Sequence, residues 1–162
     1  MNKIYELAQE LGHALLLRKF RCAVAESCTG GSLAAAITEI AGSSQWFERG
    51  FVTYSNDAKT DMLGVPTEII SVHGAVSEET ACIMAQGAVL NSLADVSVAI
   101  TGIAGPGGGT AEKPVGTVWI AWATNFQPIR VQCYLFKGDR AAVREQAVQV
   151  ALEGLIKCCV LQ

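Results

Sequence analysis

Residues 25–32 place the end of a strand-like segment, a tight turn and the start of a helix within a few positions. The segment Cys22-Ala23-Val24-Ala25 is short and apolar, residues 26–31 supply hydroxyl groups and glycines, and residues 32–41 have helical character ending at Gly42. A junction of this kind can present a hydroxyl group beside backbone N–H groups at the positive end of a helix. It predicts a fold in which strands lead into helices, with a candidate reactive turn between them.

The rest of the chain continues to alternate helical and strand patterns. We expect helices over residues 2–19, from 55 to the break at 64, from 77 to 89, and from 138 to 159, and strands over 22–25, 49–54, 96–100, 116–124 and 129–136. Residues 67–72 form a further short element, and His73 lies in a loop. With 162 residues and 51% hydrophobic content, the chain can bury one core. The sequence predicts a single α/β domain over residues 1–162, with a mixed β-sheet and helices on both faces.

Charge and composition exclude several classes of function. A net charge of −3 gives no basic field for nucleic acid, so a small-molecule substrate is the better expectation. No signal peptide core and no apolar run of about 20 residues is present, which predicts a cytoplasmic protein that does not bind membranes. The high hydrophobic content favours a homo-oligomer.

The cysteines are scattered, without a C-x-x-C pair or a nearby histidine doublet, which argues against a zinc site. We expect most of them to be reduced core residues. Cys28 is the exception, because the start of a helix would lower its thiol pKa and make it a second candidate nucleophile. The six are Cys22, Cys28, Cys82, Cys133, Cys158 and Cys159.

Two further strands end in distinctive loops. After the second strand, Ser55-Asn56-Asp57 caps a helix whose first turn contains Lys59, where a lysine is electrostatically disfavoured. After the buried strand over 96–100, residues 101–109 form a glycine-rich loop without a P-loop or dinucleotide-binding pattern. Loops at the carboxyl ends of sheet strands bind ligands in open α/β folds, so the three loops are expected to converge.

A serine mechanism is the chemistry that these loops favour. The G-x-S-x-G and S-x-x-K patterns are absent, and the two histidines lack a triad context. A partly desolvated Lys59 can accept a proton from Ser27, and Tyr54 can relay or orient that proton. The backbone amides of Thr29, Gly30 and Gly31 would then form the oxyanion hole.

Several motifs together resemble the nicotinamide-nucleotide amidases, the family of the CinA C-terminal domain. The resemblance spans nearly the whole chain, and the combination is more specific than any single motif. The motifs are A-E-S-C-T-G-G (25–31), G-S-S-x-W-F-x-R-G-F-V-T-Y-S-N-x-A-K (42–59), G-A-V-S-E (74–78), T-G-I-A-G-P-x-G-G (101–109), K-P-V-G-T-V-W (113–119) and G-D-R (138–140). Multidomain members carry an additional N-terminal domain, and we expect this chain to be the stand-alone form.

The resemblance implies hydrolysis of the carboxamide of nicotinamide mononucleotide to nicotinate mononucleotide and ammonia, a recycling step in pyridine nucleotide and NAD metabolism. It implies a metal-free serine mechanism without a cofactor, with Ser27 as nucleophile, Lys59 as general base and Tyr54 beside them. The implied substrate-binding residues are Thr29, Gly30, Gly31, Thr101, Gly102, Gly105 and Arg140, the last as a forked donor to an anion.

The sequence is also compatible with two other functions. One is a non-catalytic regulatory or interaction domain linked to competence or DNA damage, against which the intact set of Ser27, Tyr54 and Lys59 speaks. The other is an amidase for a different small amide, because pocket specificity depends on side-chain placement.

Overall fold

A single mixed sheet forms the centre of the computed structural model, which describes residues 2–160. Its strands lie in the order β2 (Phe47–Val52), β1 (Cys22–Glu26), β3 (Val96–Gly102), β4 (Thr117–Thr124) and β5 (Arg130–Leu135). Strand β1 pairs in parallel with β2 and β3, whereas β4 is antiparallel to both β3 and β5. The mixed sheet is therefore confirmed. The carboxyl ends of the three parallel strands meet at one end of it, which is where ligands bind in such sheets.

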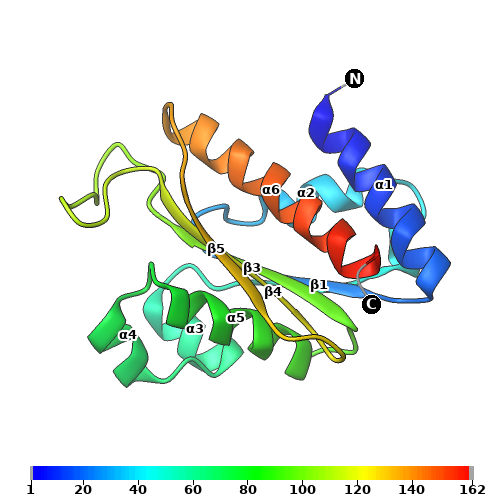
Figure 1. Cartoon of the computed structure of the whole chain (residues 1–162), viewed down its shortest axis with the longest axis horizontal. Helices are drawn as coiled ribbons and strands as arrows, with labels where there is room; N and C mark the ends of the chain where they lie inside the picture. The colour runs from blue at the N-terminus through cyan, green and yellow to red at the C-terminus, as the bar shows by residue number, and fades with distance from the viewer. Residues whose placement is uncertain (1, 161–162) are drawn as a thin grey trace.

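Helices cover both faces of the sheet, as predicted (Figure 1). On one face lie α1 (Lys3–Arg18), α2 (Ser32–Thr38) and α6 (Arg140–Val160), and on the other lie α3 (Asn56–Leu63), α4 (Thr67–His73) and α5 (Glu78–Leu90). A 3-10 helix, η1 (Ser43–Gln45), precedes β2. None of the helices in residues 2–160 is long and apolar enough to cross a membrane.

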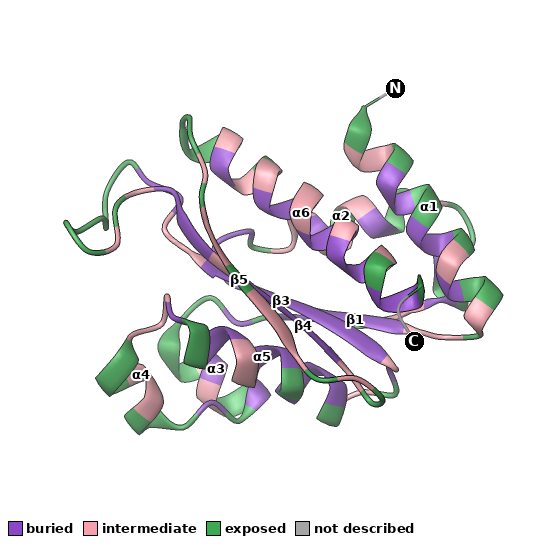
Figure 2. Ribbon diagram, in the orientation of Figure 1, coloured by how far each residue is buried: buried purple, intermediate pink, exposed green. Residues whose placement is uncertain are grey.

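The two faces bury separate cores. The larger core packs aliphatic residues of α1 and α6, such as Leu11 and Leu155, against Ile100 and other side chains of the sheet. The second core, beneath α5, is rich in alanine and includes Met84 and Phe51. Because both faces are covered, β1 is buried along its whole length and β3 nearly so, while β5 is largely intermediate or exposed (Figure 2). Doubly covered strands appear in sequence as continuous apolar runs, which explains why β1 and β3 are the clearest strand signals.

Some predicted boundaries are wrong. Helix α2 ends at Thr38 instead of residue 41, because the chain turns toward η1 with Gly42 at a φ of 84°. Strand β2 begins at Phe47, two residues before the predicted start, and ends at Val52, two residues before the predicted end. It ends there because the carbonyl groups of residues 53–55 turn toward Lys59. His73 is the last residue of α4 and not a loop residue.

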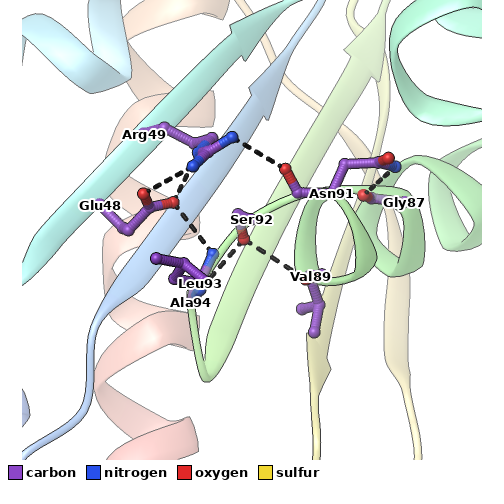
Figure 3. A network of polar contacts seen from close by, with 8 residues as sticks. All are labelled: Glu48, Arg49, Gly87, Val89, Asn91, Ser92, Leu93 and Ala94. Carbon is purple, nitrogen blue, oxygen red and sulfur yellow. Dashed lines mark hydrogen bonds and ion pairs between the residues drawn. The ribbon is translucent and has the colours of Figure 1, made fainter.

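A polar network fixes the start of the edge strand β2 to the loop after α5 (Figure 3). The Glu48 carboxylate accepts hydrogen bonds from the Arg49 guanidinium at 2.6 and 2.9 Å and from the Leu93 amide at 3.2 Å. Arg49 also donates to the Asn91 carbonyl at 3.1 Å. The hydrogen bond from Arg49 lowers the pKa of Glu48. These contacts hold the amino end of β2, at the opposite end of the strand from the candidate site.

Candidate active site

The structure brings Ser27 and Lys59 into direct contact from two different strand-to-helix junctions. Ser27 follows β1, and Lys59 lies on α3, which follows β2. The Lys59 Nζ is 3.0 Å from the Ser27 Oγ. Both residues are buried, with 8% of Ser27 and 1% of Lys59 exposed. The geometry therefore places a nucleophile and a base of the predicted types within hydrogen-bonding distance.

Backbone carbonyl groups surround the remainder of the Lys59 amine. Its Nζ donates to the carbonyl oxygens of Thr53 at 3.0 Å, Tyr54 at 3.1 Å and Ser55 at 3.5 Å. Within residues 2–160, no carboxylate forms an ion pair with Lys59. Burial lowers the pKa of Lys59, and the neighbouring Cys28 thiol opposes this shift to a smaller extent. A neutral amine has two N–H donors and one lone pair, so it can bind two of these carbonyls and accept the Ser27 proton.

The turn that carries Ser27 is bonded to β3 and to α6 and is closed by a hydrogen bond of its own. The Ser27 amide donates to the Ile100 carbonyl of β3 at 3.0 Å, which continues the sheet by one residue. The Gly30 amide closes the turn by donating to the Ser27 carbonyl at 3.0 Å. From α6, Arg144 donates to the carbonyls of Cys28 at 3.1 Å and Thr29 at 3.0 Å.

Two of the three amides predicted to form the oxyanion hole, those of Gly30 and Gly31, already have hydrogen-bond acceptors in the protein. The buried Glu26 carboxylate accepts from the Gly31 amide at 3.1 Å and from the Leu33 and Ala34 amides at 3.0 Å each. The Gly30 amide is bonded to the Ser27 carbonyl, so neither glycine has a free N–H group for an oxyanion. In the described part of the chain, the free amides of this turn belong to Cys28 and Thr29.

Cys28 does not have the environment of a nucleophile. Burial raises the pKa of its thiol to about 11, the opposite of the shift expected from a helix start. The prediction is wrong because the burial of the thiol outweighs the effects that lower its pKa, namely a backbone hydrogen bond and the charges of Arg144 and Arg140. At neutral pH, Cys28 is a protonated thiol beside the Ser27–Lys59 pair.

Tyr54 contributes a backbone carbonyl to this pair instead of its hydroxyl group. Its carbonyl lies 3.1 Å from the Lys59 Nζ and 3.5 Å from the Ser27 Oγ. The residue is 61% exposed, and its hydroxyl accepts a hydrogen bond from the Arg140 Nη2 at 3.3 Å. The predicted relay through the tyrosine hydroxyl therefore has no support in the geometry.

A pocket of about 300 Å³ opens beside the Ser27–Lys59 pair. Of the predicted substrate-binding residues, Thr101, Gly102, Gly105 and Arg140 line it, whereas Thr29, Gly30 and Gly31 do not. A larger groove of about 450 Å³ between β5 and α6 contains no nucleophile–base pair. The lining residues of the smaller pocket are Ser27, Cys28, Tyr54, Asn56, Lys59, Ala75, Val76, residues 101–105, Gly107, Gly108 and Arg140.

The glycine-rich loop and Arg140 form one wall of this pocket. The Arg140 Nη1 donates to the Gly105 carbonyl at 2.7 Å, which connects the loop to the start of α6. The Thr101 hydroxyl donates to the Ala75 carbonyl at 2.8 Å, so it ties β3 to the loop before α5. Arg140 and the glycines remain candidate ligand contacts.

Sequence reasoning missed Glu26, Asn56 and Arg144. Glu26 is the carboxylate that ends an otherwise small and apolar strand, which was a usable signal. Arg144 lies four residues after Arg140, so the two share one side of α6. Asn56 is the first residue of α3 and was noted only as part of a cap. Across residues 2–160, no group of three or more histidine, cysteine, aspartate or glutamate side chains could hold a metal ion.

Comparison with known proteins gives consistent matches over nearly the whole chain. A model described as the CinA C-terminal domain matches residues 4–159. The chain is 53% identical over 154 residues to the nicotinamide-nucleotide amidohydrolase PncC of Escherichia coli (strain K12), covering 95% of this chain and 93% of that protein. It is 48% identical over 157 residues to the protein of that name from Pseudomonas putida, covering 97% and 98%. The crystal structure of the competence/damage inducible protein CihA from Agrobacterium tumefaciens superposes with a TM-score of 0.94 at 48% identity, covering 97% of this chain and 96% of that one.

Proposed function

The chain belongs to the CinA C-terminal domain family, and we propose that it is a nicotinamide-nucleotide amidohydrolase that uses Ser27 as nucleophile and Lys59 as base. The substrate is nicotinamide mononucleotide, and the products are nicotinate mononucleotide and ammonia. The observation that carries the mechanism is the 3.0 Å contact between the Lys59 Nζ and the Ser27 Oγ at the floor of a pocket.

The first half-reaction forms an acyl-enzyme. Neutral Lys59 takes the Ser27 proton while the Ser27 Oγ attacks the carboxamide carbon, giving a tetrahedral oxyanion. The free amide of Cys28, which lines the pocket, is the donor that we assign to this oxyanion. Protonated Lys59 then gives its proton to the leaving nitrogen, the C–N bond breaks, and ammonia departs.

The second half-reaction uses the same base with water. Lys59 removes a proton from a water molecule that attacks the acyl carbon. When the new tetrahedral intermediate collapses, Lys59 returns the proton to the Ser27 Oγ and the carboxylic acid is released. The net change is one amide and one water converted to one acid and one ammonia.

The nucleotide portion of the substrate is proposed to lie along the wall formed by Arg140 and the glycine-rich loop. Arg140 is exposed and carries a forked cationic donor, which suits a phosphate. Gly105, Gly107 and Gly108 place backbone groups at the pocket surface without intervening side chains.

The test is ammonia release from nicotinamide mononucleotide, with nicotinamide riboside and nicotinamide assayed in parallel. We expect turnover of the mononucleotide with a much higher kcat/KM than for either compound that lacks the phosphate. Preference for one of the smaller amides would reassign the substrate, and no turnover of any of the three would favour a binding domain.

A further inference from the structure

The turn that carries Ser27 is held by two buried or half-buried side chains of opposite charge. Glu26 binds backbone N–H groups on one side, and Arg144 binds backbone C=O groups on the other. We propose that Glu26 and Arg144 are positioning residues that together hold the Ser27 Oγ within reach of the Lys59 Nζ. This inference rests on the proposed function, because it names the residues that prepare its nucleophile.

Glu26 is suited to this role because it joins both ends of the turn. It directly precedes Ser27 and is fully buried, and its carboxylate reaches across to the Gly31, Leu33 and Ala34 amides. Helix α2 has no capping side chain of its own, since its N-cap residue is Gly31. Without the carboxylate, buried amides at the start of α2 would lack acceptors, which destabilises this arrangement of the turn. The turn would then rearrange to satisfy them and would move Ser27.

Arg144 holds the same turn from α6. Its Nε and Nη2 bind two successive carbonyls, those of Cys28 and Thr29. The planar guanidinium fixes the spacing of these two peptide groups, which a flexible ammonium group cannot do. Together with the Gly30–Ser27 turn bond, these contacts leave the Cys28 and Thr29 amides as the free donors of the turn.

Small displacements of this turn are expected to lower the rate of the reaction strongly. A misplacement of about 1 Å can cost roughly 100-fold in rate. A glutamine at position 26 matches the size of glutamate but has only one acceptor oxygen, and its NH₂ group would face the Ala34 amide donor. A lysine at position 144 keeps the charge but loses the fork. Each substitution therefore disrupts the hydrogen bonds to the turn while keeping a side chain of similar size.

The experiment compares Glu26→Gln and Arg144→Lys with the control Asp95→Asn. The Asp95 carboxylate also accepts a backbone hydrogen bond, from Arg21 at 2.9 Å, but at the opposite end of β3. Three quantities are measured on the full chain: kcat and KM for nicotinamide mononucleotide, the rate at which a fluorophosphonate labels Ser27, and Tm.

We expect both test variants to lower kcat and the labelling rate together, by about 30- to 100-fold, with KM within about 3-fold of the wild-type value. The acid limb of the pH–rate profile should keep its midpoint, because Lys59 is unchanged. Asp95→Asn should lower Tm while leaving kcat and labelling within about 2-fold.

A folded Glu26→Gln protein with wild-type kcat and labelling rate overturns the role of Glu26, and the same result for Arg144→Lys overturns that of Arg144. If Glu26→Gln fails to fold, Arg144→Lys decides whether the turn must be held. If the wild-type protein labels at Ser27 but does not hydrolyse nicotinamide mononucleotide, the proposed substrate fails while the labelling ratios still test positioning. A wild-type protein that does not label at Ser27 overturns both proposals.

Discussion

The two strand-to-helix junctions of the site occupy equivalent places in the sheet but have opposite polarity. After β1, the backbone directs N–H groups inward, and a buried carboxylate, Glu26, accepts from them. After β2, the backbone directs C=O groups inward, and a buried lysine, Lys59, donates to them. In each junction, the hydrogen-bonding role of the buried side chain matches the backbone groups that turn toward it: an acceptor faces N–H groups and a donor faces C=O groups.

The difference shows why only one of these two buried titratable residues is a candidate base. The contacts of the Glu26 carboxylate are with the amides that it caps. Lys59 has an additional neighbour, the Ser27 Oγ, and burial lowers its pKa toward the neutral form. The first junction therefore holds the nucleophile, and the second junction activates it.

Ser27→Ala should have the largest effect, because it removes the atom at which the junctions meet. We expect kcat for ammonia release to fall by at least about 1,000-fold, with Tm and substrate binding nearly unchanged. Ser32→Ala is the matched control, since the Ser32 hydroxyl lies in the same segment but donates to the Thr29 carbonyl. Retained activity in Ser27→Ala would move the nucleophile to another group, such as Cys28 or Ser32.

Lys59→Met should follow, with a loss of about 100- to 10,000-fold in kcat, which is the range for removal of a general base. Lys157→Met, a change on α6 away from the pair, serves as control. In the wild-type protein, activity should fall as pH decreases through the lowered pKa of Lys59, because protonation removes the base. A near-normal rate for Lys59→Met at neutral pH would exclude the lysine as base.

The same substitution has a consequence for stability. The pKa of Lys59 is lower in the folded protein than its ordinary value of 10.5, so the unfolded chain binds more protons between these two values. Wild-type stability should therefore rise relative to that of Lys59→Met as pH increases through this window. Urea unfolding of both proteins at pH 7 and pH 10 measures the difference, and a gap that does not change with pH contradicts the assignment.

Arg140→Met should have a smaller effect, confined to binding. Charge-assisted hydrogen bonds contribute about 1.5–3 kcal/mol, so KM for nicotinamide mononucleotide should rise about 10- to 100-fold while kcat changes little. Nicotinamide riboside, which lacks the phosphate, should be affected far less. Equal losses of activity for both compounds would contradict the assignment of Arg140 to the phosphate. Arg49→Met, at the far end of β2, is the control.

Tyr54→Phe should have the smallest effect. It removes the hydroxyl that accepts from Arg140 but keeps the backbone carbonyl that faces Lys59. We expect kcat to remain within about 3-fold of the wild-type value, because no proton passes through the hydroxyl. A loss comparable to that of Lys59→Met would restore the tyrosine relay and contradict the geometry.

The sequence by itself predicted the mixed sheet and its two helical layers, and, with the family resemblance, it identified Ser27 and Lys59 as the candidate nucleophile and base. The local signals were apolar runs in β1 and β3, a cap at Ser55 and a lysine in an unfavourable helical position. Such signals depend on neighbouring residues, so they can be read along the chain.

Only the tertiary structure decided which polar groups are free and which are already bonded. It showed that the Gly31 amide belongs to Glu26, that the Tyr54 hydroxyl faces Arg140, and that burial raises the pKa of Cys28 to about 11. It also brought Arg144 to the Ser27 turn from α6, more than 100 positions away along the chain. Hydrogen bonding and desolvation depend on atoms that meet through space, and no local pattern in the sequence records those meetings.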